Sequence, residues 1–354
     1  MRLVNVENIQ PNMELAKPIN HQGQTLLNTG INNLHKYKKR LLDIGVNYVY
    51  INDKYSQDIE LKDVVKKETR NKSKKIIKET FQGIEFNQDI NITKVKDVVN
   101  DIIDDILFNS EDLMVNMVDI KSFDSYTFEH SVNVAVLSII LGKSINLPRK
   151  KLYKLGIGAI LHDIGKMLIP KKVLKKTDKL TEEEYEIIKE HPRLGYDYLK
   201  NKNEISPVSK IIILSHHERL DGTGYPKRIP KKEIHQFGKI VAITDVFDAL
   251  TSDRIYRDRW PIHKAINYLM SNTDNKFDSN LVKKFIRNIA VYPNGTKVKL
   301  KNGEKAIVKE QNKNFPTRPV IKIIENNNEK KETSQTQTLD LMEHFNKVID
   351  KVIQ

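Results

Sequence analysis

The stretch LHDIGK, residues 161–166, closes an apolar helical pattern and sets a His-Asp pair at its end. Apolar residues recur just before it at helical spacing, namely Leu152, Leu155, Ile160 and Leu161. Patterns of this kind continue over residues 113–290, where Thr181 followed by three glutamates, and Pro207, mark helix starts. The sequence therefore predicts a mainly α fold centred on a helical-bundle domain.

Smaller units are predicted before that domain. Residues 1–58 combine the short apolar stretches MELAKPIN and GQTLLNTG with an amphipathic helix that stops near Gly45, followed by the strand VNYVYIN. This combination predicts a small β-containing α/β unit. Residues 59–112 are helical in pattern and highly charged. We expect them to form a connector that packs on the next domain or pairs with a second chain in a homodimer.

A second small unit is predicted after the domain. Residues 291–325 carry an Asn302-Gly303 turn between short apolar stretches, which predicts a β-hairpin, with RPVIKII as a third strand. For residues 326–354 we expect a polar, disordered stretch and then a last short helix, LDLMEHFNKVIDKVIQ.

The composition bounds the possible chemistry. A chain of 354 residues with 39% hydrophobic and 30% charged residues suits a soluble globular protein of two or three modules. The lack of cysteine excludes disulfides, zinc fingers, iron–sulfur clusters and thiol nucleophiles, so any metal must sit on His, Asp or Glu. No apolar run approaches the ~20 residues that span a bilayer, and the first residues show no secretory signal. We therefore expect a cytoplasmic protein without a membrane span.

The formal net charge of +14 has two interpretations. An excess of positive charge attracts polyanions such as nucleic acids or an anionic membrane surface. Alternatively, lysines merely cover solvated faces. We favour the second interpretation and expect no nucleic-acid partner, because lysines occur from end to end, with little aromatic interleaving and no nucleic-acid-binding motif.

Histidines suggest where the chemistry lies. A single buried histidine is more often an ordinary core residue than a ligand, so the joint pattern matters more than any one position. Five histidines sit at or near helix ends or in turns: His130, His162, His191, His216 and His217. They lie in four segments that occur in the order YTFEHS, LHDIGK, EHPRLG and SHHERLDGTGYP, and a fifth segment, ITDVFDALTSDRIYR, follows. Helix ends of a bundle can converge on one metal site, and nitrogen and oxygen ligands without thiolates suit Fe, Mn, Ni or Co.

With these segments the chain resembles the HD-GYP family of the HD superfamily, over residues 113–290. The resemblance implies a phosphodiesterase of bacterial second-messenger signalling that hydrolyses cyclic di-GMP to linear pGpG, and in some members on to GMP. It also implies two divalent metal ions, iron or manganese. The implied ligands are His130, His162, Asp163 and Asp245 for one ion, and Asp163 as the bridging carboxylate with His191, His216 and His217 for the other.

The resemblance further implies how the substrate is handled. Asp163 and Lys166 would be the catalytic residues, with Lys166 on the scissile phosphate. A water that bridges two ions about 3.5–4 Å apart becomes hydroxide near neutral pH and attacks phosphorus in line. Arginines suit a dianionic substrate because each grips phosphate through two parallel hydrogen bonds. The implied substrate-binding residues are Lys166, Gly224, Tyr225, Pro226, Arg254 and Arg257.

One position departs from the family pattern. Some members bind a third metal through a glutamate four residues before the first histidine, where this chain has Tyr126. Glu129 lies one residue before His130, so on a helix it points about 100° away and is a poor substitute. We therefore predict two metals. Since three-metal members are linked to hydrolysis as far as GMP, we expect pGpG as the main product.

Two alternatives stay open. The first is an HD-type phosphohydrolase acting on another nucleotide, including a mixed cyclic dinucleotide; it would share the metal site, whereas the Gly-Tyr-Pro loop with Arg254 and Arg257 favours a cyclic dinucleotide. The second is a catalytically weak receptor for cyclic di-GMP. The presence of every expected ligand favours the enzyme.

Overall fold

The computed structural model divides the chain into two compact units. One contains Val64–Glu111 and Ser125–Ile286 and is helical; the other contains Met1–Asp63 and Arg287–Gln354 and is built around strands. The predicted fold class, mainly α with small strand-containing units at both ends, is confirmed. The residues that the structure describes are 1–21, 24–53, 55–59, 63–86, 88–108, 114–115, 126–174, 176, 178–252, 259–313, 315–325 and 337–353.

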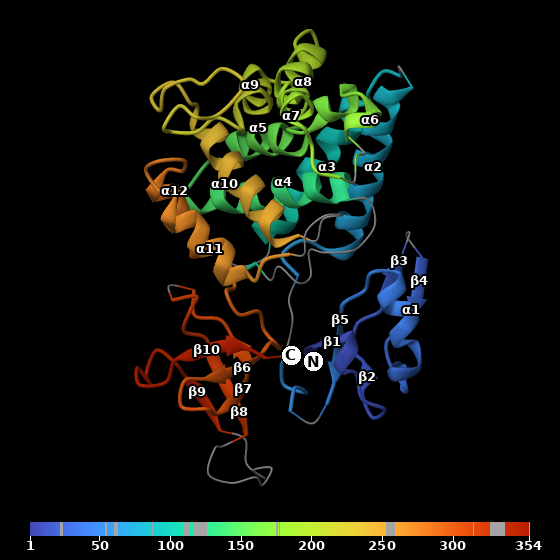
Figure 1. The fold of residues 1–354 in the computed structure, drawn as a ribbon, viewed down its shortest axis with the longest axis vertical. Coiled ribbons are helices and arrows are strands. Elements are labelled where there is room, and N and C mark those ends of the chain that lie inside the picture. Colours follow the sequence, from blue (N-terminus) through green and yellow to red (C-terminus); the bar gives the residue numbers. More distant parts are fainter. Residues whose placement is uncertain are drawn as a thin grey trace. The chain divides into compact units, whose positions relative to one another are not determined.

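Helices make up the unit that carries the His-Asp motifs (Figure 1). Two of them, α4 and α10, lie in its middle and are buried on nearly every side, as expected for core helices. In the described part of the chain, no helix is both long and apolar enough to cross a membrane. The elements of this unit are α2 (Lys67–Glu85), α3 (Ile92–Phe108), α4 (Tyr126–Ser144), α5 (Arg149–Ile160), the 3₁₀ helix η3 (Ile164–Leu168), α6 (Lys171–Leu174), α7 (Glu182–Lys189), α8 (His191–Leu199), α9 (Pro207–Ser215), α10 (Gln236–Thr251), α11 (Ile262–Ser271) and α12 (Ser279–Ile286).

The charged segment predicted as a connector supplies α2 and α3. Both pack onto the rest of the helical unit: α2 lies against α3 and α4, and α3 lies against α5. The buried face of α3 includes Val95, Val98 and Ile102, which are spaced three and four residues apart. An apolar stripe therefore joins this segment to the helical unit, while most of its charges remain on the outer faces, with Arg70 and Asp105 as buried exceptions.

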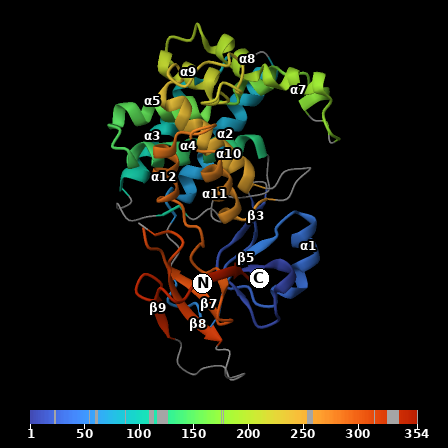
Figure 2. The same cartoon turned by 60° about the vertical axis from the view of Figure 1, so that its left-hand side comes forward.

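Two predicted helix starts are present. The Thr181 side chain accepts a hydrogen bond from the Glu184 backbone N–H, and the Glu184 carboxylate accepts one from the Thr181 N–H, so α7 begins with a capping box. Ser206 caps α9, with Pro207 in its first turn. Because α7 buries none of its residues, it lies at the periphery of the helical unit (Figure 2).

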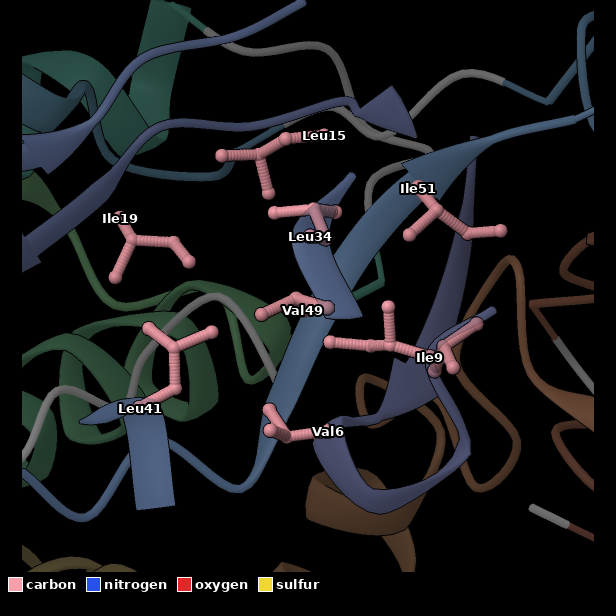
Figure 3. Packing of buried hydrophobic residues seen from close by; sticks show 9 residues of the cluster. Val6, Ile9, Leu15, Ile19, Leu34, Leu41, Val49 and Ile51 are labelled. Atoms are coloured by element: carbon pink, nitrogen blue, oxygen red, sulfur yellow. The ribbon is translucent and has the colours of Figure 1, made fainter. Parts of the chain in front are cut away.

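The N-terminal strands enclose a small core. The three-stranded antiparallel sheet has the order β1-β5-β2, beside a separate β3-β4 pair. Leu34 and Leu41 pack against Val49 and Ile51, and Gly45, with φ of 80°, ends the helical segment as predicted (Figure 3). The elements are β1 (Arg2–Asn5), the 3₁₀ helix η1 (Val6–Asn8), β2 (Glu14–Leu15), β3 (Ile19–His21), β4 (Gln24–Leu27), the 3₁₀ helix η2 (Leu34–Tyr37), α1 (Lys38–Asp43) and β5 (Tyr48–Asn52).

The C-terminal strands form one antiparallel sheet with the order β10-β6-β7-β8-β9. The predicted hairpin is β6–β7, with Gly303 at φ of 91° in its turn, and the predicted third strand is β8. The strands are β6 (Lys297–Leu300), β7 (Lys305–Glu310), β8 (Val320–Glu325), β9 (Thr338–Asp340) and β10 (Ile349–Val352).

The short helix predicted for the last residues is wrong, because this segment forms β9 and β10. Leu339 and Leu341, two residues apart, both enter the sheet core, as does Ile349. β9 pairs with β8 and β10 pairs with β6, so the segment adds one strand to each edge of the sheet formed by β6, β7 and β8. Pairing between distant parts of the chain thus overrides a local helical spacing. The predicted disordered stretch falls mostly on residues 326–336, outside the described residues.

Candidate metal centre

Seven His and Asp side chains meet inside the helical unit. His130 comes from α4 and Asp245 from α10; His162 and Asp163 follow α5, and His191 begins α8, while His216 and His217 follow α9. They form two groups, and in each group one nitrogen or oxygen per residue lies within 4.8 Å of the others. The first group is His130, His162 and Asp245, and the second is Asp163, His191, His216 and His217. The structure thus brings together all seven residues predicted to be ligands.

Asp163 lies between the two groups. Its Oδ1 is 3.3 Å from His191 Nε2 and 3.9 Å from His216 Nε2. Its Oδ2 is 3.3 Å from His162 Nε2 and 3.7 Å from His130 Nε2. One carboxylate therefore presents one oxygen to each group, which is the arrangement that a bridging ligand requires.

Three histidine rings are oriented by the helices that they follow. In each, Nδ1 donates to the carbonyl oxygen three residues earlier, at 2.7–2.8 Å, in the last turn of α5, α7 or α9. Such carbonyls lack partners within the helix, and they can only accept a hydrogen bond. The proton therefore sits on Nδ1, and Nε2 keeps its lone pair. The pairs are His162 with Ala159, His191 with Ile188, and His216 with Ile213.

The free lone pairs of these side chains face one another, and their arrangement shows whether a cation would fit between them. His191 Nε2 and His216 Nε2 are 3.3 Å apart, although both are acceptors in the tautomers just described. His162 Nε2 and Asp163 Oδ1 are buried without a hydrogen-bond partner. Buried acceptors without a donor are costly, so a bound cation would stabilise this cluster. The donor set therefore fits divalent metal ions.

Charges in the centre also suit a cation. Burial lowers the pKa of His191, and burial with neighbouring histidines holds the pKa values of His216 and His217 well below their usual range. For Asp163, burial raises the pKa, but His162 and Lys166 outweigh it and hold the pKa well below its usual value. At neutral pH these three imidazoles are therefore neutral and lie beside an ionised carboxylate.

His130 differs from the other histidines. Burial lowers its pKa, but the carboxylates of Asp245 and Asp248 outweigh burial and raise the pKa to about 9. Its Nε2 is 3.1 Å from Asp245 Oδ1, and its Nδ1 is 2.7 Å from Asp248 Oδ2. Metal binding at this group must therefore displace a proton.

Lys166 lies at the edge of the centre. It belongs to η3, and its Nζ donates to Asp163 Oδ2 at 2.6 Å. Its side chain keeps 25% of its surface exposed, whereas that of Asp163 keeps 1%. Lys166 thus connects the buried carboxylate with the solvent side of the site.

The Gly-Tyr-Pro loop packs directly on the paired histidines. The Tyr225 ring stacks on His217 at 4.5 Å between centroids, and Tyr225 N–H donates to the His217 carbonyl at 3.2 Å. Burial raises the pKa of the Tyr225 hydroxyl, which stays neutral. A Cβ on Gly224 would come within 2.4 Å of Arg219 N, so this close approach requires glycine. Pro226 completes the turn and is partly buried.

Two predicted substrate residues, Arg254 and Arg257, lie outside the described residues.

Glu129 belongs to neither candidate ligand group among the described residues. Its buried carboxylate instead pairs with Lys74 Nζ at 2.6 Å. This is consistent with the expectation that Glu129 does not replace the glutamate absent at Tyr126.

Two buried carboxylates were missed by the sequence reasoning. Glu218 follows the paired histidines and accepts hydrogen bonds from the backbone N–H groups of Lys227 and Ile229, at 2.8 and 3.3 Å, so it holds the loop after Tyr225. Asp248 is bonded to His130. Its position one helical turn after Asp245 was a usable signal, because residues three apart share a helix face.

Residues 101–281 match the HD domain family, a segment that spans half of the chain and includes all seven clustered His and Asp residues. The chain belongs to the HD domain family. HD domain phosphohydrolases bind divalent metals. Residues 297–354, which form the C-terminal sheet, match a KOW domain associated with HD domains.

Curated relatives include several phosphodiesterases. The chain is 33% identical to the cyclic di-GMP phosphodiesterase PA4108 of Pseudomonas aeruginosa over 252 residues, which is 71% of this chain and 60% of that protein. It is 31% identical to the cyclic di-GMP phosphodiesterase PdeB of Borreliella burgdorferi over 65% of this chain and 60% of that protein. It is 36% identical to the 3'3'-cGAMP-specific phosphodiesterase 1 of Vibrio cholerae over 51% of this chain and 41% of that protein. The chain thus spans at most about 60% of the length of these relatives.

A solved structure supports the fold. Bd1817, a HDG"Y"P protein from Bdellovibrio bacteriovorus, aligns with a TM-score of 0.53 at 21% identity, over 80% of this chain and 97% of that one.

Proposed function

We propose that the chain is a metal-dependent phosphodiesterase of the HD-GYP type that hydrolyses cyclic di-GMP to linear pGpG in a catalytic domain at residues 113–290. One observation carries the proposal: Asp163 presents an oxygen to each of two His-Asp groups whose buried acceptors lack donors. The names of the relatives PA4108 and PdeB support the choice of substrate.

Each group of ligands would hold one ion, with Asp163 shared between the two. Nitrogen and oxygen donors without thiolates favour iron or manganese. When bound, two such ions would activate a water for in-line attack and neutralise charge on the phosphoryl oxygens. The carbonyl-bonded Nδ1 atoms keep the Nε2 lone pairs turned inward, so little reorganisation is needed.

The exposed rim of the centre would bind the substrate. Lys166 Nζ lies beside Asp163 and reaches the solvent side, where it would meet the scissile phosphate. The neutral Tyr225 hydroxyl would donate a hydrogen bond to the substrate, and the Tyr225 ring is held against His217. Gly224 and Pro226 would shape that loop, and Arg254 and Arg257 would grip phosphate or guanine.

We propose two metals rather than three, because Glu129 is engaged by Lys74 and Tyr126 replaces the glutamate of three-metal members. With two metals, pGpG is the expected main product. Metal analysis of purified protein that finds three equivalents would overturn this proposal.

Turnover by protein reconstituted without oxygen, with Fe or Mn, tests the function. Cyclic di-GMP and 3'3'-cGAMP are supplied separately and in competition, and the products are resolved by chromatography. Preferred conversion of cyclic di-GMP to pGpG supports the proposal, and a larger kcat/KM for 3'3'-cGAMP favours the alternative substrate suggested by the Vibrio relative. Tight nucleotide binding without product would favour a receptor.

We predict that Arg254→Ala lowers kcat/KM for cyclic di-GMP about 10- to 100-fold while the metal content is unchanged, because a phosphate grip is lost away from the ions. Steady-state kinetics and metal analysis check this. Arg193→Ala, an exposed arginine on α8, is the matched control and should change neither quantity. Loss of metal in the Arg254 variant would contradict the assignment.

Glu218→Gln is predicted to raise KM roughly tenfold, because one oxygen that accepts a backbone N–H becomes an amide donor and the loop after Tyr225 loosens. The same substitution at the exposed Glu233 is the control. An unchanged KM with an intact fold would show that Glu218 does not hold the loop in its binding form.

A further inference from the structure

Helix α2 lies outside the matched HD domain segment, which begins at residue 101. Even so, two of its side chains point toward the helix that carries His130. Arg70 and Lys74 are four residues apart and therefore share one face of α2. Arg70 is buried, and the Lys74 side chain keeps 22% of its surface exposed.

Arg70 begins a chain of buried polar contacts that ends at His130. Its guanidinium donates to Asn133 Oδ1 at 3.4 Å, and Asn133 Nδ2 donates to Asp248 Oδ1 at 3.1 Å. The other Asp248 oxygen is 2.7 Å from His130 Nδ1. Asn133 and Asp248 are almost fully buried, so water does not compete with these contacts.

Each contact determines the next. The Asp248 carboxylate oxygen faces His130 Nδ1 as an acceptor, so the proton stays on Nδ1 and Nε2 is left for the metal. The Asn133 amide nitrogen can donate to Asp248 only when the Asn133 amide oxygen points away from Asp248. In the structure that oxygen accepts the hydrogen bond from Arg70. Arg70 therefore selects the amide orientation that supports Asp248.

A second, independent contact links α2 to Glu129, the residue before His130. Lys74 Nζ is 2.6 Å from a carboxylate oxygen of Glu129, whose side chain is only 6% exposed. Glu129 immediately precedes His130 on α4. A buried carboxylate strongly favours a nearby cation, so this pair ties α2 to α4 beside the ligand.

We propose that α2 is a working part of the metal centre: Arg70, through Asn133 and Asp248, and Lys74, through Glu129, position His130 and thereby set the affinity of the ion held by His130, His162 and Asp245. The inference rests on the proposed metal centre but not on the proposed substrate. These are positioning residues, which act through His130 and touch no reacting atom.

The test is a Mn²⁺ titration of the full chain, without nucleotide, with free Mn²⁺ followed by electron paramagnetic resonance. For wild type we expect two bound ions. Asp248→Asn should weaken one ion about 10- to 100-fold and leave the other unchanged. Arg70→Met should weaken the same ion by a smaller factor. Lys72→Met, which removes an exposed α2 lysine that pairs with Asp101, is the matched control and should change neither ion.

Two combinations separate positioning from general loosening of the fold. Arg70→Met added to Asp248→Asn should have no further effect, because both act along one chain of contacts. In a His162→Ala background, which retains only the second ion, Asp248→Asn should leave Mn²⁺ affinity unchanged. If Arg70→Met does not fold, Asn133→Ala interrupts the same chain without removing a charge and should give the same selective loss.

Equal weakening of both ions, additive effects in the double variant, or a folded Asn133→Ala protein with wild-type affinity would overturn the inference. Wild-type protein that binds no Mn²⁺ would overturn it together with the metal centre. If the variants selectively lose affinity for one ion but the wild-type protein does not hydrolyse cyclic di-GMP, the inference about α2 is supported and only the proposed substrate is refuted.

Discussion

Asp163→Ala is expected to abolish both metal binding and turnover. Asp163 presents a different oxygen to each group of candidate ligands, one 3.3 Å from His191 and the other 3.3 Å from His162. Its removal leaves Asp245 as the remaining carboxylate of the two candidate ligand groups, too little negative charge to offset two divalent ions. We expect turnover to fall at least about a thousandfold, because both water activation and charge neutralisation depend on the ions.

Metal analysis of the purified variant and product chromatography check this expectation together. Asp197→Ala, an exposed aspartate on α8, is the control and should keep full metal content and activity. Asp163→Asn retains the shape and one acceptor oxygen, so it should bind less metal than wild type but more than the alanine variant. Turnover by Asp163→Ala with a full metal complement would refute the proposed bridging role.

The resemblance to the HD-GYP family implied the full set of seven residues, and three of its histidines also carry a physical signal in the sequence. His162 and His216 directly follow apolar helices, where the last carbonyls need donors, and the same bond forms at His191 after α7. A histidine at such a position turns its Nε2 away from its own helix. Periodicity that predicts where helices end therefore supports these three histidines, whereas His130 and Asp245 lie within helices and rest on the resemblance.

The supporting contacts were not accessible in this way. His130 and Asp248 are 118 residues apart in the sequence, and Arg70 and Asn133 are 63 apart. No local pattern pairs such positions, because they meet only when α2, α4 and α10 pack. The same limit explains the error at the C-terminus, where Leu339 and Ile349 lie in strands recruited by the edges of a distant hairpin.

Gly165→Ala is expected to damage the centre without touching a ligand. A Cβ at this position would lie 1.9 Å from the His191 carbonyl oxygen and 2.5 Å from Gly195 N. Both are backbone atoms of α8, so η3 and α8 must separate, and Asp163 moves away from His191. We expect a destabilisation of about 1–3 kcal/mol. Activity should fall roughly a hundredfold, since a displacement of about 1 Å has that effect on a reacting geometry.

Gly83→Ala provides the matched comparison, because among the described residues the new methyl group would meet the Gln88 side chain alone, at an ordinary contact distance of 3.8 Å. Alanine is the better helix former, so this change in α2 should stabilise the helical unit by about 0.5–1 kcal/mol and leave turnover unchanged. Denaturant unfolding, metal content and turnover of both variants give the result. If Gly165→Ala lowers stability but keeps metal content and activity, the prediction is contradicted. The close packing of η3 on α8 would then stabilise the fold without determining the distance between Asp163 and His191.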